Sequence, residues 1–380
     1  MDFEKIFWDD IASNAEVSLF TGENGVDELH AIVHLEAKGD SFESQLQRMY
    51  RAEQLLSQTS QFEGTSVVFK RYFLSDAVNQ VPLMTQDANT ECSVSYIQQP
   101  PLDGTKIALW IYSQRGTKIF KENGVTVSEH NGYKHLWKMG LLIGKGDSAY
   151  QTEYLLKEYE KMLATYGANI ADNCLRTWFY VRDVDIQYAG MVKARKENFI
   201  LNGLTEKTHY ISSTGIGGMP ADPKAIIQLG TYALVGLTPD QQRYLYAPTH
   251  LNPTYEYGVT FERGTLVEYG ERGHIYISGT ASINNKGEVM YVGDIVRQTE
   301  RMWENVEKLL EEGGMSFDDV AQIIVYLRDT ADYQVVNKMF KKKFAKTPFV
   351  LTLAPVCRPT WLIEMECVAI DRRHTNHKDF

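Results

Sequence analysis

The feature that most constrains how this chain folds is a segment that occurs three times. Residues 151–183 open with Gln-Thr-Glu and close with Tyr-Val-Arg-Asp, and the pattern returns at residues 298–329 with one residue lost between its two halves. A fainter copy occupies residues 53–76. A unit that is repeated three times packs against its own copies, so the seams between the units are candidate sites.

The first half of each copy has the pattern of an amphipathic helix, and the second half has the pattern of a strand. Apolar residues recur at matching positions of the second and third copies with the spacing of one helix face: Leu155, Tyr159, Met162 and Leu163 against Met302, Val306, Leu309 and Leu310. A β-rich run follows each helix, at residues 67–69, 178–181 and 323–327. This order predicts an α+β unit with one sheet backed by helices. We expect three such units to close into an internal pseudotrimer, with the sheets inward and the helices outside.

The repeat also sets the expected boundaries. The strand at residues 107–112 is expected to open the second unit, and the Tyr- and Pro-rich stretch between the second and third units favours an ordered loop over a flexible linker. The polar tail is expected to fray. The expected divisions are a divergent first unit at 1–105, a second unit at 106–236, an inserted loop at 237–263, a third unit with the site at 264–371, and the tail at 372–380.

Composition and charge limit the class of protein. Hydrophobic residues make up 43% of the 380, charged residues make up 23%, and no apolar run is long enough to span a membrane. The N-terminal residues lack the basic-then-apolar order of a signal peptide, and the four cysteines form no Cys-x-x-Cys pair, which indicates reduced thiols in the cytoplasm. The net charge of −10 repels phosphate backbones, so we do not expect nucleic acid as a partner. Because no apolar run is long enough, we do not expect a membrane as partner either.

Glu364 is the first candidate for chemistry. The alternation of Leu362-Ile363-Glu364-Met365-Glu366 places Glu364 and Glu366 on one side of a strand. Taken alone, this pattern is more typical of a solvated face than of an acid held in a cleft. The equivalent strand of the second copy carries Gln228 in place of Glu364, however, and an acid in one copy against an amide in the other indicates that one seam is specialised.

Two further groups of residues could hold a substrate near this strand. Cys357, seven residues before Glu364 and next to Arg358, is either a small buried hydrophobe or a thiol in the pocket wall. Arg263 could bind a carboxylate through two hydrogen bonds from its guanidinium, and Tyr257 could donate a hydrogen bond to the same carboxylate. The alternative is that Arg263 is simply exposed in a surface loop, which is more common for an arginine.

Glycine-rich segments suggest close approach to a ligand. Residues 213–218, Ser-Thr-Gly-Ile-Gly-Gly, read as a turn that follows a β-rich run; they lack the features of a P-loop or a dinucleotide fingerprint but could offer backbone N–H groups to a small anion. A plain tight turn is the alternative. The small residues at 278–282 would likewise let a ligand reach the backbone. The candidates in these segments are Thr214, Gly215, Gly217, Gly279 and Thr280.

A metal site is not expected. His30 and His34 stand four residues apart, a ligand spacing on a helix, but the surrounding residues alternate like a strand and no third ligand is evident.

Several of these motifs together resemble the Rid superfamily, also called the YjgF or "endoribonuclease" family of reactive-intermediate deaminases. The resemblance rests on about a hundred residues of the third unit, from Gly273-His274 through the Ser-Gly-Thr-Ala-Ser string at 278–282 and Tyr326-Leu327-Arg328-Asp329 to the Glu364 strand. Members are chorismate-mutase-like α+β units that form trimers with sites between subunits. The resemblance therefore implies that this chain carries three Rid-like units and mimics the trimer alone.

Within the superfamily the chain most resembles the chorismatases, which remove pyruvate from chorismate. The similarity lies in residues 213–217, the Tyr-Gly-x-x-Phe-x-Arg string at 257–263, residues 278–283, and Cys357-Arg358 with the Glu364 strand. It implies that Glu364 is a general acid that protonates the methylene of the enolpyruvyl ether, which requires a glutamate protonated near neutral pH. It also implies that Cys357 lines the ring pocket, that Arg263 and Arg358 hold carboxylates, and that no cofactor is needed.

Two other functions stay open. Simple Rid deaminases bind the substrate carboxylate with an arginine early in the penultimate strand, where this chain has Val350, which weakens the case for an enamine or imine hydrolase. A non-catalytic protein that binds a small carboxylate in the same cleft is the third possibility. Ribonuclease activity is the least favoured, because of the charge and the lack of a suitable histidine pair. We expect a small-molecule carboxylate as partner, and either a monomeric pseudotrimer or a further homo-oligomer.

Overall fold

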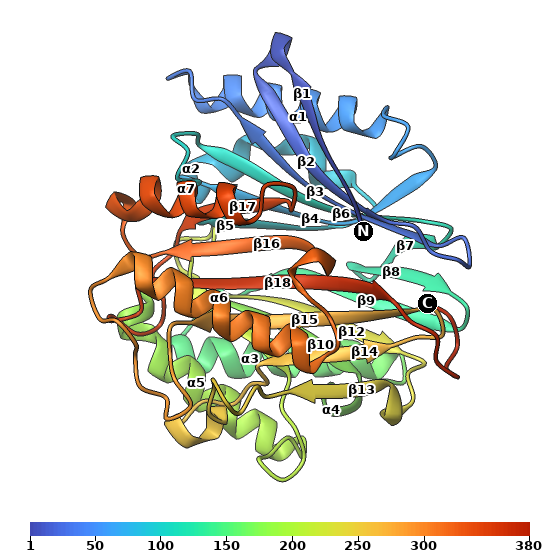
Figure 1. Cartoon of the computed structure of the whole chain (residues 1–380), viewed down its shortest axis with the longest axis vertical. Helices are drawn as coiled ribbons and strands as arrows, with labels where there is room; N and C mark the ends of the chain where they lie inside the picture. Colours follow the sequence, from blue (N-terminus) through green and yellow to red (C-terminus); the bar gives the residue numbers. More distant parts are fainter.

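The computed structural model describes residues 1–380, except the side chains of Ala88 and Asn89. Three six-stranded sheets share one strand order, in which the last strand of the unit lies in the middle of its sheet (Figure 1). The first three strands of each unit run antiparallel as a meander, and the outermost pair on the other side is parallel. This shared topology confirms the α+β pseudotrimer.

The first unit has one long helix, α1. It begins after the N-cap Ser41, whose side chain accepts a hydrogen bond from the Ser44 backbone N–H. The elements are β1 (Asp2–Trp8), β2 (Ser13–Phe20), β3 (Asp27–Leu35), α1 (Phe42–Ser57), β4 (Thr65–Leu74), the short α2 (Ala77–Gln80), β5 (Ser93–Gln98) and β6 (Ile107–Arg115).

The second unit has two long helices, α3 and α5, which pack against each other. Its elements are β7 (Lys118–Glu122), β8 (Val125–His130), β9 (Tyr133–Leu142), α3 (Ser148–Thr165), α4 (Ile170–Asn173), β10 (Cys174–Val181), α5 (Val184–Leu201), β11 (Ser212–Gly217) and β12 (Ile227–Val235).

The third unit repeats this plan with α6 and α7. The expected apolar face of α6 is confirmed, because Met302, Val306, Leu309 and Leu310 are all fully buried. The elements are β13 (Gln242–Leu245), β14 (Gly264–Glu268), β15 (Arg272–Ala281), α6 (Ile295–Glu312), β16 (Val320–Leu327), α7 (Tyr333–Lys343), β17 (Phe349–Leu353) and β18 (Ile363–Arg372).

Two expected boundaries were wrong. β6, which was expected to open the second unit, is a middle strand of the first sheet, paired with β3 on one side and β4 on the other. The inserted stretch is not only a loop, because it contributes β13 to the third sheet. The first error arose because an apolar run indicates a strand but does not say which neighbour it pairs with; the second arose because Gln-Arg-Tyr-Leu at 242–245 is not an apolar run and gave no strand signal.

The sheets face one another at the centre and the helices cover the outside (Figure 1). One hydrophobic core joins inward residues of all three sheets, including Phe69, Trp178 and Tyr326. At its centre the carboxylate of Glu366 on β18 accepts hydrogen bonds from groups of the second unit and forms an ion pair with Arg71 of the first. The distances are 2.8 Å from Arg176 Nη2, 2.8 Å from Trp178 Nε1, 2.5 Å from Thr214 Oγ1 and 3.4 Å from Arg71 Nη1.

The tail does not fray as expected. Phe380 is 1% exposed, and its ring packs among His130, His135 and Tyr269. The guanidinium of Arg272 lies 4.4 Å from the centre of the same ring. The polar composition of the tail gave no sign of this packing, because one aromatic residue, Phe380, anchors an otherwise polar segment.

Candidate active site

A small cavity lies at the seam between the second and third units, and Glu364 is part of its wall. β18 brings Glu364 to the cavity opposite Ala281 of β15. The pairing of these strands shifts between Ile277 and Thr280, and Gly279 lies in this bulge. A Cβ atom on Gly279 would stand 2.2 Å from Glu364 Oε1, so glycine is needed for the carboxyl to lie where it does.

Glu364 is held as a carboxylic acid. Burial raises the pKa of Glu364, the neighbouring charge of Glu366 raises it further, and Arg176 and Arg263 only partly oppose them, so the pKa is about 8. The side chain is 3% exposed. A glutamate that keeps its proton at neutral pH can act as a general acid, so the interpretation of this strand as a solvated face is wrong.

Two buried arginines reach the same cavity, and each has at least one N–H group without a hydrogen-bond partner among the described residues. Arg195 of α5 donates to Ser213 Oγ at 3.3 Å, and Arg263 donates to Asn252 O at 3.0 Å and to its Oδ1 at 3.2 Å. Nε and Nη2 of Arg195, and Nε of Arg263, are buried without a partner among the described residues. A buried guanidinium with unused donors is costly unless a ligand pairs with it, and carboxylates fit its planar fork.

Aromatic and sulfur groups complete the wall. The ring of Tyr257 lies under the guanidinium of Arg263 at 5.3 Å, and its hydroxyl is buried without a partner among the described residues. Tyr188 of α5 and the half-buried Arg358 also line the cavity. Burial, and then the charge of Glu364, raise the pKa of the Cys357 thiol, which lines the cavity, to about 12, so this thiol is protonated at neutral pH.

Most of the predicted site residues meet here, but three do not. Glu364, Arg263, Tyr257, Cys357, Arg358, Gly215 and Gly279 all line the cavity. Thr214 lies behind the cavity wall, where its hydroxyl donates a hydrogen bond to Glu366 and accepts one from the Gly279 N–H. Gly217 packs against Pro355, and the Thr280 hydroxyl donates to the Ser278 carbonyl.

The predicted glycine-rich turn was also wrong, because residues 212–217 are strand β11, which pairs in parallel with β10. Glycine is needed there for close approach and not for a turn: a Cβ on Gly215 would stand 3.0 Å from the Tyr188 ring. β11 is an edge strand that pairs only with β10 among the described strands, and on its other side the Ser213 N–H donates to Ser278 Oγ at 2.8 Å and the Gly217 N–H to the Pro355 carbonyl at 2.9 Å.

The sequence interpretation missed Arg195 and Tyr188. Both lie on α5 and are seven residues apart, so they share one helix face. Arg195 is buried beside Met191, Asn198 and Phe199. A charged residue within the buried stripe of a helix was the signal that could have revealed it.

The other two seams carry different residues at the position of Glu364. Glu364 pairs with Tyr326, and the matching pairs are Gln228 with Tyr180 and Ala108 with Phe73. The Gln228 amide donates to Ser95 Oγ at 3.3 Å and to the Tyr96 carbonyl at 3.1 Å. Only one of the three equivalent positions therefore holds an acid.

The described side chains contain no group of three or more His, Cys, Asp or Glu residues that could hold a metal ion. His30 and His34 lie on strand β3, as the alternation predicted. No helix among the described residues is both long and apolar enough to cross a membrane.

The fold and the cavity define a three-unit α+β protein with an acid in one seam, and comparisons with known proteins place it in a family. The family model described as Endoribonuclease L-PSP matches residues 265–371. A RutC family protein of Pyrococcus abyssi is 34% identical over 97 residues, which are 25% of this chain and 76% of the relative. A RutC family protein of Pyrococcus horikoshii is 32% identical over 97 residues, 25% of this chain and 77% of the relative.

The chain therefore belongs to the Rid superfamily of endoribonuclease L-PSP and RutC proteins, as its motifs indicated. A crystal structure of a chorismatase superimposes with a TM-score of 0.61 and 19% identity, over 80% of this chain and 93% of that one. This similarity extends the shared fold beyond the third unit to most of the chain.

Proposed function

We propose that this protein is a chorismatase-like enzyme that cleaves the enolpyruvyl ether of chorismate, or of a related carboxylate, by acid catalysis and releases pyruvate. The observation that carries the proposal is a protonated, buried Glu364 in the same cavity as two arginines with unused donors. An acid supplies the proton that the ether needs, and the arginines supply partners for substrate carboxylates.

The reaction begins with proton transfer from the Glu364 carboxyl to the terminal methylene carbon of the enol ether. The methylene becomes a methyl group, and positive charge develops on the ether carbon and oxygen. Water or a ring atom captures this centre; with water, the hemiketal formed loses the ring oxygen as an alcohol and leaves pyruvate. Glu364 regains its proton from the captured water, so no cofactor is consumed. The expected second product is a dihydrodiol or a hydroxybenzoate.

The substrate can enter only if part of the wall moves. The cavity is about 20 Å³, which is room for about one water molecule, and chorismate is several times larger. The inserted loop supplies Tyr257, Val259 and Phe261 to the wall, and Val259 also lines a larger outer pocket of about 390 Å³. Displacement of this loop would join the two spaces.

The test is release of pyruvate from chorismate by the wild type and by Glu364→Gln. The variant keeps the shape of the side chain but cannot donate a carboxyl proton, so we expect turnover to fall by at least about a hundredfold. Glu262→Gln is the matched control, because Glu262 is also a buried carboxyl but accepts from the Tyr210 N–H outside the cavity. An active Glu364→Gln protein would refute the mechanism.

An enamine or imine hydrolase is the second candidate, and Arg195 is the observation that favours it. The residues that match Val350 in the second and first units are Thr214 and Ser95. None of the three units therefore has, at this strand position, the arginine of simple Rid deaminases. Arg195 reaches the cavity from α5 and could hold the substrate carboxylate instead. Ammonia release from an amino-acid-derived enamine, with no pyruvate from chorismate, would favour this function. Binding without turnover of either substrate would favour a carboxylate-binding protein.

A further inference from the structure

The first unit has a groove on its outer face, in the place where the other two units have a second long helix. In the second unit that helix, α5, follows the aspartate that ends the repeated segment and packs against α3. The matching Asp76 of the first unit caps only the short α2, which ends at Gln80, since Pro82 has no N–H to donate to the carbonyl one turn before it. Two 3-10 turns, Val81–Leu83 and Thr85–Asn89, continue the chain. They leave a groove of about 670 Å³ beside α1, which is within the size range of small-molecule sites and is not used by the function proposed above.

Every residue that lines this groove belongs to the first unit, so the groove is not one of the seams. Its apolar part consists of three buried side chains: Leu56, Phe62 and Ile111. Its polar part is an ionic cluster in which Lys70 Nζ lies between two carboxylates, forming an ion pair with Glu53 and donating to Asp87 Oδ1 at 3.0 Å. Burial lowers the pKa of Lys70, but the two carboxylates outweigh it and hold the pKa above its ordinary value. One ammonium thus faces two carboxylates, and the cluster has an excess negative charge of one.

Three polar side chains of the same lining each have a buried atom with no hydrogen-bond partner among the described residues. These atoms are Oδ2 of Asp87, Oγ of Ser113 and the hydroxyl oxygen of Tyr50. Ser113, on β6, is fully buried, and Asp87 is 5% exposed. Burial, and then the charge of Asp87, raise the pKa of Tyr50 to about 12, so its hydroxyl is neutral and lies near the same carboxylate. Buried polar atoms normally have partners, so three such atoms around one groove indicate that a ligand supplies them.

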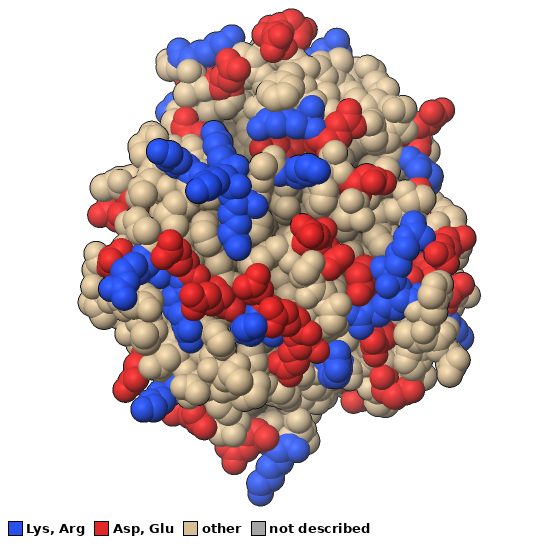
Figure 2. All heavy atoms as spheres, viewed as in Figure 1, with Lys and Arg blue, Asp and Glu red and all other residues tan. Residues whose placement is uncertain are grey.

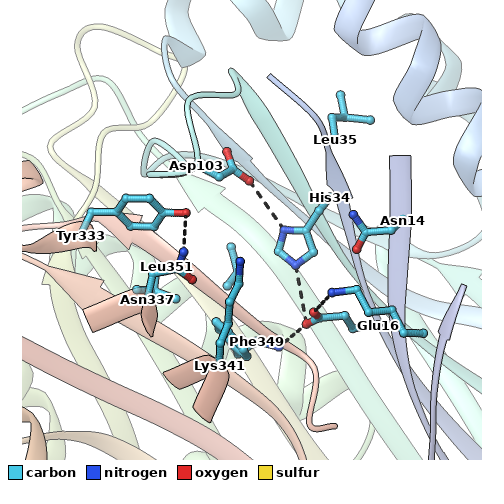
Figure 3. Close-up of a pocket in the computed structure, with 12 residues that line it drawn as sticks. Asn14, Glu16, His34, Leu35, Asp103, Tyr333, Asn337, Lys341, Phe349 and Leu351 are labelled. Carbon is cyan, nitrogen blue, oxygen red and sulfur yellow. Dashed lines mark hydrogen bonds and ion pairs between the residues drawn. The ribbon is translucent and has the colours of Figure 1, made fainter. Parts of the chain in front are cut away.

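The pocket between the first and third units differs from this groove, because its acidic groups are already paired with cations (Figure 3). His34 lies between Asp103 and Glu16, with a ring nitrogen 3.8 Å from an oxygen of each, and Glu16 also accepts from Lys5 Nζ at 2.8 Å. The remaining cation, Lys341, is exposed among the basic side chains that gather over α7 (Figure 2). Among the described side chains, the uncompensated charge of that pocket therefore lies in water, whereas that of the groove beside α1 is buried.

The excess negative charge of the groove determines the kind of ligand that fits it. Arg51 is the other cation of the lining, but it is exposed and donates to Gln54 Oε1 at 2.7 Å, so water screens its charge. An anion would face Glu53 and Asp87 together, whereas a cation would be attracted by both. An ammonium group also brings N–H donors to the unpartnered oxygens, and the apolar side chains favour an organic body over a hydrated metal ion.

We propose that the groove beside α1 is a binding site for a small organic monoamine, with Asp87 and Glu53 as the partners of its ammonium group. The ammonium donates to Asp87 Oδ2 and to the hydroxyl oxygen of Tyr50, and the apolar body of the ligand packs against Phe62 and Ile111. The Ser113 hydroxyl is left for a second polar group on that body. The site lies within one unit and contains none of the residues assigned to the cleavage reaction.

Phenethylammonium is the probe, and titration calorimetry of the full chain at neutral pH is the first measurement. 2-Phenylethanol has the same ring and chain without the charge, so it should bind at least about tenfold more weakly. Asp87→Asn keeps an oxygen for Lys70 but removes the excess charge, and it should weaken binding of the amine by at least about tenfold. Glu43→Gln is the matched control and should bind as the wild type does, because Glu43 is an exposed carboxylate of α1 outside the groove. Equal affinities for the amine and the alcohol, or equal affinities of Asp87→Asn and the wild type, would overturn the proposal.

Hydrogen exchange of the wild-type protein locates the bound amine without any substitution that could disturb the fold. Saturating phenethylammonium should slow backbone exchange several-fold in peptides from the second half of α1 and from residues 81–92. Peptides of α6, the equivalent helix of the third unit, should be unchanged. Slowing confined to β18 beside the catalytic cavity, or no slowing in the first unit, would contradict the placement. Neither measurement depends on chorismate cleavage, which is followed by pyruvate release.

Discussion

Replacing Gly279 with alanine should disable the acid without disturbing the rest of the fold. The added Cβ would stand 2.2 Å from Glu364 Oε1 and 2.8 Å from its Cδ, where ordinary contact begins at 3.4 Å. The carboxyl must therefore retreat by about 1 Å, because the methyl group cannot move out of the bulge in β15. A misplacement of about 1 Å costs roughly a hundredfold in rate, which corresponds to about 2.7 kcal/mol of activation free energy.

The change in stability should be modest by comparison. Overpacking of a well-packed site typically costs about 1–3 kcal/mol. Here the main displaced group is the Glu364 carboxyl beside a cavity, and Thr214 Cγ2, at 3.1 Å from the added Cβ, must shift slightly as well. Gly264→Ala on β14 is the matched control, because its nearest neighbour is Ile277 Cδ1 at 3.1 Å, the far end of a flexible side chain. We expect Gly264→Ala to keep most of its turnover.

The assay is pyruvate release from chorismate, coupled to lactate dehydrogenase, with thermal unfolding of each variant measured in parallel. A folded Gly279→Ala protein with wild-type turnover would refute the placement of Glu364 as the acid. If the variant unfolds at a much lower temperature, turnover measured well below that temperature still separates the two effects.

Two further predictions concern the titration of Glu364 and the packing of Phe380. Turnover should be steady below neutral pH and fall as pH rises through about 8, the pKa of Glu364; a rate that rises through this range would contradict an acid role. The folded protein keeps this proton up to about pH 8, whereas the unfolded chain releases it near pH 4.5. Between these two pH values the free energy of unfolding should therefore fall by up to about 1.4 kcal/mol per pH unit. The fall should be shallower in Glu364→Gln. Phe380→Ala should lower the free energy of unfolding by about 3 kcal/mol, measured by denaturant titration, because its ring is fully buried among aromatic residues; His374→Ala, on the same tail but exposed, should change it little.

The repeat made the fold largely predictable, whereas the site was only partly so. Periodicity within α6 and the strand that follows each helix are local signals, and both were confirmed. Glu364 emerged because two copies could be compared at one position, where the other copy has Gln228. Comparison within the chain thus supplied part of what an alignment would supply.

What could not be predicted depends on contacts between distant segments. Arg195 reaches the cavity because α5 of one unit faces β18 of the next, and no local pattern records that juxtaposition. The segment at 212–217 has turn-forming residues but becomes a strand, because it pairs with β10 and lies close to Pro355. Burial of Glu364 and Glu366 likewise depends on the neighbouring unit.

The network around Glu366 has a consequence for how this chain acquires its fold. Arg71 and Arg176 belong to segments that leave the ribosome well before β18, the last of the described strands to be synthesised. Until β18 arrives, two guanidinium groups destined for the centre lack their shared counter-charge and are best left in water. The first two units can therefore assemble only provisionally during translation, and the chain should commit to its closed form in a single late step. A nascent chain halted before β18 should accordingly stay sensitive to proteases that spare the finished protein.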